Sequence, residues 1–128
     1  ETVAVAFDPN GDIIWDQSIK LEDIKRPALE QVSDFYIEGE NLHFIYKLES
    51  ELKIKSISLE EGTATETTEK IRLESPSDEV RSEKELEDGV RHWVDNAFFV
   101  WGYQTIRNPE NKDNRVIYVF YINKIVVN

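Results

Sequence analysis

Short runs of β-branched and aromatic residues, separated by turn sequences roughly every 8 to 12 residues, extend through almost the whole chain. The first two runs, Val3 to Phe7 and Asp12 to Ile19, flank the tetrapeptide Asp8-Pro9-Asn10-Gly11. The Asp side chain is an acceptor for turn amides, the Pro fixes φ, and the Gly suits the left-handed position that closes a type I turn. The sequence therefore predicts a β-hairpin here.

Four further runs predict an antiparallel meander: Val32 to Ile37, Leu42 to Leu48, Leu52 to Leu59 and Ala64 to Leu73. In the second run apolar side chains alternate with polar ones, and His43 and Lys47 share the polar face, as in a half-buried strand. The fourth run is rich in Thr and Glu and is predicted to be a solvated edge. The preceding connector is expected to contain one helical turn after Pro27.

The last third of the chain returns to strand patterns after a charged segment. Ser75 to Gly89 is predicted to be a surface loop with a short helix from Asp78. Strands are predicted at Arg91 to Val94, Ala97 to Ile106 and Arg115 to Val127. Because Val116 to Ile122 is apolar or aromatic on both faces, we expect a central strand covered on both sides.

The fold class that follows is all-β, built of antiparallel four-stranded meanders that resemble propeller blades in size. The regular spacing of strands and turns fits a self-contained β-sandwich or barrel equally well. With 128 residues, the chain is expected to be a single β-rich domain or a fragment of a propeller, with sub-units at about 1–22, 23–74 and 75–128.

Charge narrows the classes of partner. The formal net charge of −11 opposes contact with nucleic acid and with anionic membranes, and no apolar run is long enough to cross a bilayer. The absence of Cys excludes disulfides and thiolate sites but leaves the compartment open, with the bacterial cell envelope and the secreted fraction as candidate locations of a soluble chain. The chain lacks Met and begins within a strand pattern, which predicts a processed product or a piece of a longer protein.

The sequence contains one partial metal-binding pattern. Asp8, Asn10, Asp12 and Asp16 have the spacing of positions 1, 3, 5 and 9 of a calcium loop. The Gly and the bidentate Glu of that loop are replaced by Ile13 and Ile19, so the favoured interpretation is a plain hairpin turn. No phosphate loop, dinucleotide fingerprint or zinc spacing occurs, and no catalytic residues, metal or cofactor are expected.

Aromatic residues gather in the last third. Trp93, Trp101 and Tyr103, together with Phe99, fall in one predicted strand pair. Exposed aromatic rings on a sheet stack on sugars or anchor a protein partner, whereas buried rings pack the core. These residues are the candidate ligand or partner surface, with core packing as the alternative.

Two segments of the chain match in pattern: Ala6 to Trp15 and Ser58 to Thr65 each contain a strand end, an acid, a tight turn with Gly and a new strand. Their glycines are 51 residues apart, near the span of one four-stranded blade, and roughly two and a half such units fill the chain. The first segment resembles the blade signature of quinoprotein-type and related β-propellers, whose positions are occupied by Ala6, Phe7, Asp8, Gly11 and Trp15. The resemblance is to the blade unit and implies no cofactor.

These observations lead to a functional hypothesis without a catalytic site. The chain is expected to be a non-catalytic, propeller-like scaffold or protein-interaction domain whose open sheet edges are covered by a protein partner, by the remainder of a longer chain, or by a second copy in a homo-oligomer. A carbohydrate-binding or glycoside-processing module that uses Trp93, Trp101 and Tyr103 is the alternative from a different class, and a self-contained β-sandwich binding domain is the third.

Overall fold

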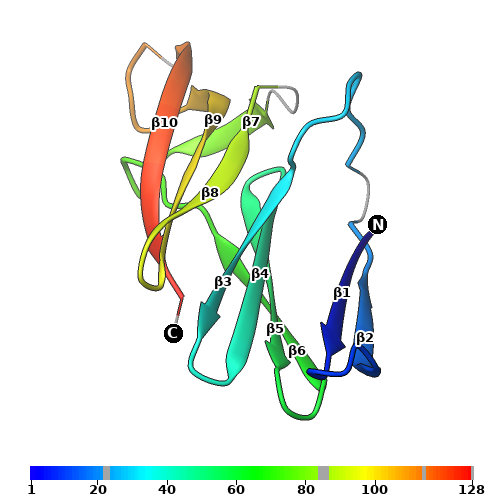
Figure 1. Ribbon diagram of the computed structural model, residues 1–128. Helices are drawn as coiled ribbons and strands as arrows, with labels where there is room; N and C mark the ends of the chain where they lie inside the picture. The colour runs from blue at the N-terminus through cyan, green and yellow to red at the C-terminus, as the bar shows by residue number, and fades with distance from the viewer. Residues whose placement is uncertain (22–23, 84–86, 114, 128) are drawn as a thin grey trace.

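The computed structural model describes residues 1–21, 24–83, 87–113 and 115–127 and is all-β over these residues, as predicted. Three antiparallel sheets form (Figure 1). Their strands are β1 Thr2–Phe7 and β2 Ile13–Ile19; β3 Ser33–Glu38, β4 Asn41–Leu48, β5 Glu51–Ser58 and β6 Ala64–Lys70; and β7 Glu79–Glu83, β8 Gly89–Val94, β9 Ala97–Arg107 and β10 Val116–Val126. We call them the hairpin layer, the middle sheet and the third sheet.

The N-terminal hairpin forms as its turn sequence predicts. The Asp8 carboxylate accepts hydrogen bonds from the backbone amides of Asn10 at 2.8 Å and Asp12 at 2.9 Å. Gly11 has a φ of +90°, which an L side chain rarely adopts. The turn chemistry read from the sequence therefore sets the pairing of β1 with β2.

The middle sheet is the predicted four-stranded meander, with the order β3-β4-β5-β6. Every residue of β6 is exposed, which confirms the solvated edge. The connector before β3 has a bend at residues 27–28, and residues 24–32 contain no helical turn, so that prediction is wrong. The Arg91 guanidinium donates a hydrogen bond to the Gln31 carbonyl at 3.0 Å, which ties the segment after Pro27 to β8 instead.

The third sheet has β9 between β10 on one side and both β7 and β8 on the other. The β7 strand replaces the predicted surface loop and short helix, which are wrong for Glu79 to Glu83. Residues 84–86 of that loop lie outside the described residues. The strand forms because Val80 pairs with Ile106, a contact between distant segments that overrides the polar local sequence.

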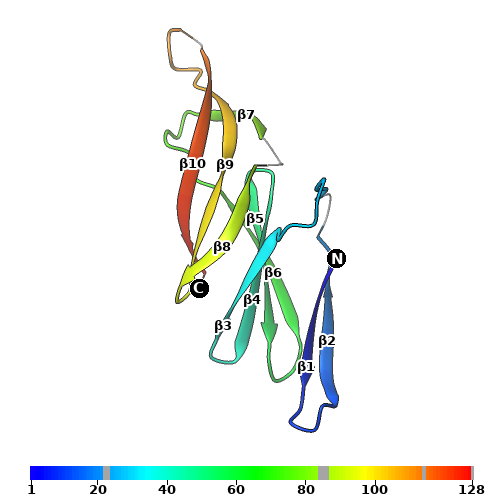
Figure 2. The same ribbon diagram turned by 45° about the horizontal axis from the view of Figure 1, so that its top comes forward.

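The three sheets are stacked, with the middle sheet between the other two (Figures 1 and 2). One core lies between the middle and third sheets and is formed by Ile45, Leu52, Ile54, Ile71, Val90, Phe98, Val100, Ile125 and Val127. A second lies between the middle sheet and the hairpin layer and is formed by Ile19, Phe44, Tyr46 and Ile57. The middle sheet is therefore covered on both faces.

Two predictions about strand burial are corrected by this stacking. In β4, residues 43–47 are all buried, so this strand is not half-buried. Conversely, Val116 to Ile122 is not a central strand covered on both sides, because β10 pairs only with β9 and is an edge strand. No layer of the described chain covers its outer face, and Tyr118, Phe120 and Ile122 are 59%, 54% and 60% exposed.

The hairpin layer is held by two side-chain hydrogen bonds to the turn between β5 and β6. The Trp15 indole donates to the Leu59 carbonyl at 2.7 Å, and the Gln17 amide donates to the Gly62 carbonyl at 2.6 Å. A Cβ on Gly62 would lie 2.7 Å from Cγ of Trp15, so only glycine allows this approach. The two segments that match in sequence pattern thus contact each other across the layers.

Candidate functional site

The outward side chains of the third sheet form an exposed aromatic surface. The antiparallel register pairs Phe120 with Tyr103 and Ile122 with Trp101, so the odd residues of β9 and the even residues of β10 share one face. The opposite face carries Phe98 and enters the core. We define the aromatic face as Trp93, Phe99, Trp101, Tyr103, Tyr118, Phe120 and Ile122.

The rings of the aromatic face contact one another. Tyr103 lies between Tyr118, with ring centroids 5.6 Å apart and planes at 13°, and Phe120, with centroids 5.2 Å apart. Phe99 lies 5.4 Å from Trp101 on the same face. The rings therefore form two groups on one face, one of Tyr103, Tyr118 and Phe120 and one of Phe99 and Trp101, with Ile122 opposite Trp101.

Cations surround the aromatic face, and carboxylates are missing from its strands. The Arg91 guanidinium lies 5.7 Å from the Trp101 ring centroid, and the Lys124 ammonium lies 5.6 Å from that of Trp93. The sequences of β8, β9 and β10 contain no Asp or Glu. Residues 89–128 carry a formal charge of +2, whereas residues 1–88 carry −13. Strands β8, β9 and β10 are thus a basic part of an acidic molecule, whereas β7 of the same sheet carries Glu79 opposite Arg107 and Glu83 opposite Gln104.

The three residues singled out from the sequence lie together on this surface. Trp93 is 61% exposed, and Trp101 and Tyr103 are partly exposed. Sequence reasoning missed Tyr118, Phe120 and Ile122, because it assigned them to a strand covered on both sides. The polar hairpin between the last two predicted strands was the signal that could have found them, since it pairs Tyr118 and Phe120 with the strand of Tyr103.

Of the four candidate metal ligands, Asp8, Asn10 and Asp12 lie at the first turn, whereas Asp16 lies in β2. The pKa of Asp8 is lowered chiefly by the backbone amide of Asp12, so this carboxylate is already engaged by its own turn. Asp16 lies in β2 opposite Val5, away from that turn. Asn10 and Asp12 contribute backbone amides to Asp8. Among the residues that the structure describes, no group of three or more His, Asp or Glu is placed to hold a metal ion.

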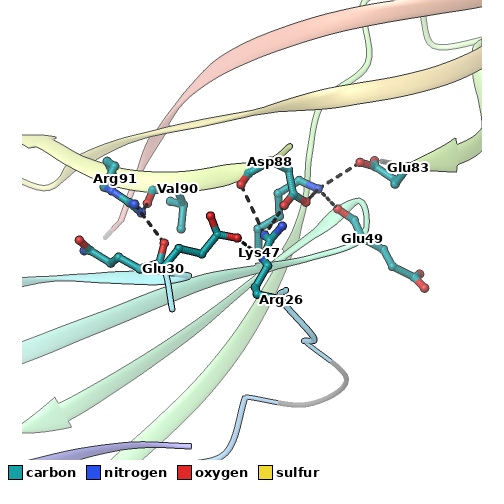
Figure 3. A network of polar contacts seen from close by, with 9 residues as sticks. Arg26, Glu30, Lys47, Glu49, Glu83, Asp88, Val90 and Arg91 are labelled. Atoms are coloured by element: carbon teal, nitrogen blue, oxygen red, sulfur yellow. Dashed lines mark hydrogen bonds and ion pairs between the residues drawn. The ribbon is translucent and has the colours of Figure 1, made fainter. Parts of the chain in front are cut away.

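A buried charge cluster joins the middle sheet to the third sheet (Figure 3). The Lys47 ammonium donates to Asp88 at 2.7 Å and to Glu83 at 3.0 Å, and it also donates to the Glu49 carbonyl. The Arg26 guanidinium binds the same Asp88 carboxylate at 2.5 Å, and Gln104 donates to Glu83 at 2.6 Å. Two cations therefore face two buried carboxylates, and the more exposed Glu30 also pairs with Arg26 at 3.3 Å.

The protonation of this cluster argues against catalysis. Burial acts to lower the pKa of Lys47, but the hydrogen bond to Asp88 and the charge of Glu83 outweigh it, and the pKa is raised. The ammonium is thus held in its charged form and is not a nucleophile. The cavity beside Lys47, Arg26 and Asp88 measures about 20 Å³, which is room for about one water molecule. The cluster ties layers together.

Both histidines belong to the packing between the middle and third sheets. The His92 ring stacks on Tyr36 at 4.8 Å, and the His43 ring lies 6.5 Å from the same tyrosine. His43 contacts the Ser56 hydroxyl at 2.8 Å, but its other ring nitrogen is 3.8 Å from Glu38, beyond hydrogen-bond distance. With His43 buried, this arrangement is a cross-strand pair rather than a nucleophile and its base.

Comparisons with known proteins give no assignment for this chain. In the part of the chain that the structure describes, no helix has the length and apolar character needed to cross a membrane. A scan against protein-family models, a search of curated proteins and a search of solved structures each found no match to this chain.

Proposed function

We propose that this protein is a non-catalytic protein-interaction domain that docks a protein partner through the aromatic face. The observation that carries the proposal is that β10, an edge strand apolar on both sides, exposes Tyr118, Phe120 and Ile122 beside two tryptophans. From Tyr118, which is opposite Thr105, to Phe99 this face extends over six residue steps of β9, roughly 20 Å at about 3.3 Å per residue. Apolar patches of that extent on a soluble domain mark interaction surfaces.

The composition of the aromatic face supports a protein as the partner. Trp, Tyr and Arg are enriched at the energetic centres of protein interfaces, and Trp101, Tyr103 and Arg91 are all present here. Because the face carries cations and its strands carry no carboxylate, we infer that the partner presents an aliphatic surface with an acidic rim.

Carbohydrate binding is less well supported by the same residues. Sugar recognition needs free ring faces and hydrogen-bonding side chains for the hydroxyls. The rings of Trp93 and Trp101 have Lys124 and Arg91 over them, and Tyr103 is stacked on Tyr118. Glycoside processing would further need a pair of carboxylates, and β8, β9 and β10 supply none.

The propeller-like scaffold expected from the sequence agrees with this proposal. The middle and third sheets pack face to face across a shared core, but only the middle sheet is a four-stranded meander like a propeller blade. In such a scaffold, the aromatic face is the surface against which a further sheet packs. The partner is then a sheet layer of another protein or of a longer parent chain.

A displayed random-peptide library, selected on the immobilised full chain, tests the proposal. We expect enriched peptides that combine aliphatic and acidic residues. Their affinity should fall at least about tenfold in the double variant Phe120→Ser/Ile122→Ser, because both side chains lie on the aromatic face. The matched control is Phe35→Ser, which removes an aromatic ring of similar exposure from β3 and should leave binding unchanged.

A glycan array probed with the same proteins completes the experiment. Peptide selection that depends on Phe120 and Ile122, with no glycan bound, supports the proposal. The proposal is overturned if no peptide is enriched, if enriched peptides bind the double variant equally well, or if a glycan binds the wild-type chain and is lost in that variant.

A further inference from the structure

The hairpin layer carries a second uncovered apolar face. The inward residues of β1 and β2 pack on the middle sheet, where Ala4 and Trp15 contact the core. The alternate residues point outward, and Val3 and Phe7 are 55% and 58% exposed. We define the hairpin face as Val3, Val5, Phe7 and Ile13, which is paired with Phe7.

The charges around the two uncovered faces are opposite. Residues 1–20, which form the hairpin layer, contain four carboxylates and one lysine. Asp8 lies at its turn and Asp16 lies directly opposite Val5, on the outward side of β2. The aromatic face is bordered by Arg91 and Lys124. The hairpin face is thus apolar with carboxylates beside it, which matches the acidic rim inferred for the partner of the aromatic face.

The two faces of one chain cannot meet. The hairpin layer and the third sheet pack on opposite sides of the middle sheet, and their outer faces point away from each other (Figure 2). A contact between them therefore joins two molecules. It is heterologous, since a different surface of each copy takes part, and such contacts produce open chains or closed rings.

We propose that the hairpin face of a second copy of this chain docks on the aromatic face, so that the protein associates head to tail. The inference rests on the proposed function and names its partner. Apolar side chains of Val3, Val5 and Phe7 then cover the aromatic face, and Asp16 lies near the basic rim. The added layer gives the third sheet cover on both faces, as the middle sheet has within one molecule.

Sedimentation velocity over a range of protein concentrations tests this arrangement with two face variants. Phe120→Ser/Ile122→Ser alters the aromatic face, and Val5→Ser/Phe7→Ser alters the hairpin face. The wild-type chain should form species larger than dimers, and each variant alone should associate at least about tenfold more weakly. Circular dichroism checks that the variants fold, and Phe35→Ser on β3 is the control that should associate like the wild type.

The decisive measurement is a mixture of the two variants. Each retains the intact face that the other lacks, so a 1:1 mixture should form dimers and nothing larger. Raising NaCl from 0.1 to 1 M should weaken the wild-type association, because charges border both faces.

Association of the hairpin variant at wild-type strength, or a mixture that stays monomeric, overturns the head-to-tail arrangement. A wild-type chain that is monomeric at every concentration also overturns it. If peptides selected by the wild-type chain still depend on Phe120 in that last case, the proposed function stands and only the second copy as partner fails.

Discussion

Strands β4 and β10 show how little the composition of a strand determines its burial. Strand β4 carries His43 and Lys47 on one face, yet its residues 43–47 are buried on both faces. Strand β10 has the more apolar sequence, yet Phe120 and Ile122 are more than half exposed. The difference lies in the neighbouring layers, because β4 has a sheet on either side and β10 has one only.

The polar residues of β4 tolerate burial because each has a partner. His43 contacts the Ser56 hydroxyl, and Lys47 binds Glu83 and Asp88. A buried polar group costs little once it is hydrogen-bonded, and a buried charge requires an opposite charge. The comparison therefore predicts large effects for changes in β4 and small effects on stability for equivalent changes in β10.

The largest difference in unfolding free energy is expected between two lysines that both lie over aromatic rings. The buried Lys47 ammonium lies 5.9 Å from the centroid of the Tyr121 ring, and the exposed Lys124 ammonium lies 5.6 Å from the centroid of the Trp93 ring. Lys47→Ala leaves Glu83 without its cation and should reduce the free energy of unfolding by about 3–5 kcal/mol. Lys124→Ala should cost less than about 1 kcal/mol. Urea unfolding, at a protein concentration that keeps the chain monomeric, measures the free energy of unfolding of both variants. Equal losses would contradict the assignment of Lys47 as buried and Lys124 as exposed.

The next largest difference in unfolding free energy is expected between two isoleucines, one buried and one exposed. Ile45→Ala removes a fully buried side chain from the core between the middle and third sheets and should cost about 2–5 kcal/mol. Ile122→Ala removes the same atoms from an exposed position and should cost less than about 1 kcal/mol. The same urea titration measures both, and a large loss for Ile122→Ala would mean that β10 is covered in the folded chain.

A smaller effect is expected where the hairpin layer meets the middle sheet. Gly62→Ala places a Cβ against Trp15 at a φ of +70°, whereas Gly39→Ala, at +55°, meets no atom within 4 Å. Both changes carry the cost of a left-handed backbone, about 1–2 kcal/mol, and only the first adds a steric clash of about 1–3 kcal/mol. The clash should also raise the solvent exposure of Trp15, which a red shift of tryptophan fluorescence detects. Identical behaviour of the two variants would indicate that the layers are separate.

The smallest change in stability is expected only at alkaline pH. Burial raises the pKa of Tyr121 to about 12, whereas an unfolded tyrosine loses its proton near pH 10. Between these values the unfolded chain binds fewer protons than the folded one, so stability is fully present below about pH 10 and falls as the pH rises toward 12. The urea midpoint should therefore drop over this window, and Tyr121→Phe should flatten the drop. An unchanged slope in that variant would assign the loss to other groups, such as Lys47, whose pKa is also raised.

Much of the fold could be predicted because local signals specify it. The Asp8 to Gly11 turn and the alternating runs of the middle sheet carry their own pairing information. The β7 strand could not be predicted, since its only apolar residue is Val80 and its pairing with Ile106 depends on contacts between distant segments. The stacking of the sheets could not be predicted from the sequence either. The pattern therefore predicts a half-buried β4 and a β10 covered on both faces, whereas β4 is buried on both faces and β10 is covered on one.

The candidate site could be predicted in part. Trp93, Trp101 and Tyr103 were identified from the clustering of aromatic residues, but their exposure depends on what covers the third sheet. The pairing of Phe120 with Tyr103 extends the face to a second strand. The contacts of Arg91 and Lys124 with the tryptophan rings depend on side-chain positions that sequence spacing does not give.

The division of one edge of β9 between β7 and β8 has a consequence for the charge cluster. In an unbroken strand, side chains on the same face follow one another along a single line at about 6.6 Å. Glu83 ends β7 and Asp88 precedes β8, and both carboxylates reach the same ammonium of Lys47 within 3.0 Å. Because the strand is interrupted, the two carboxylates come from two separate strand ends, and the single ammonium of Lys47 holds both ends against β4.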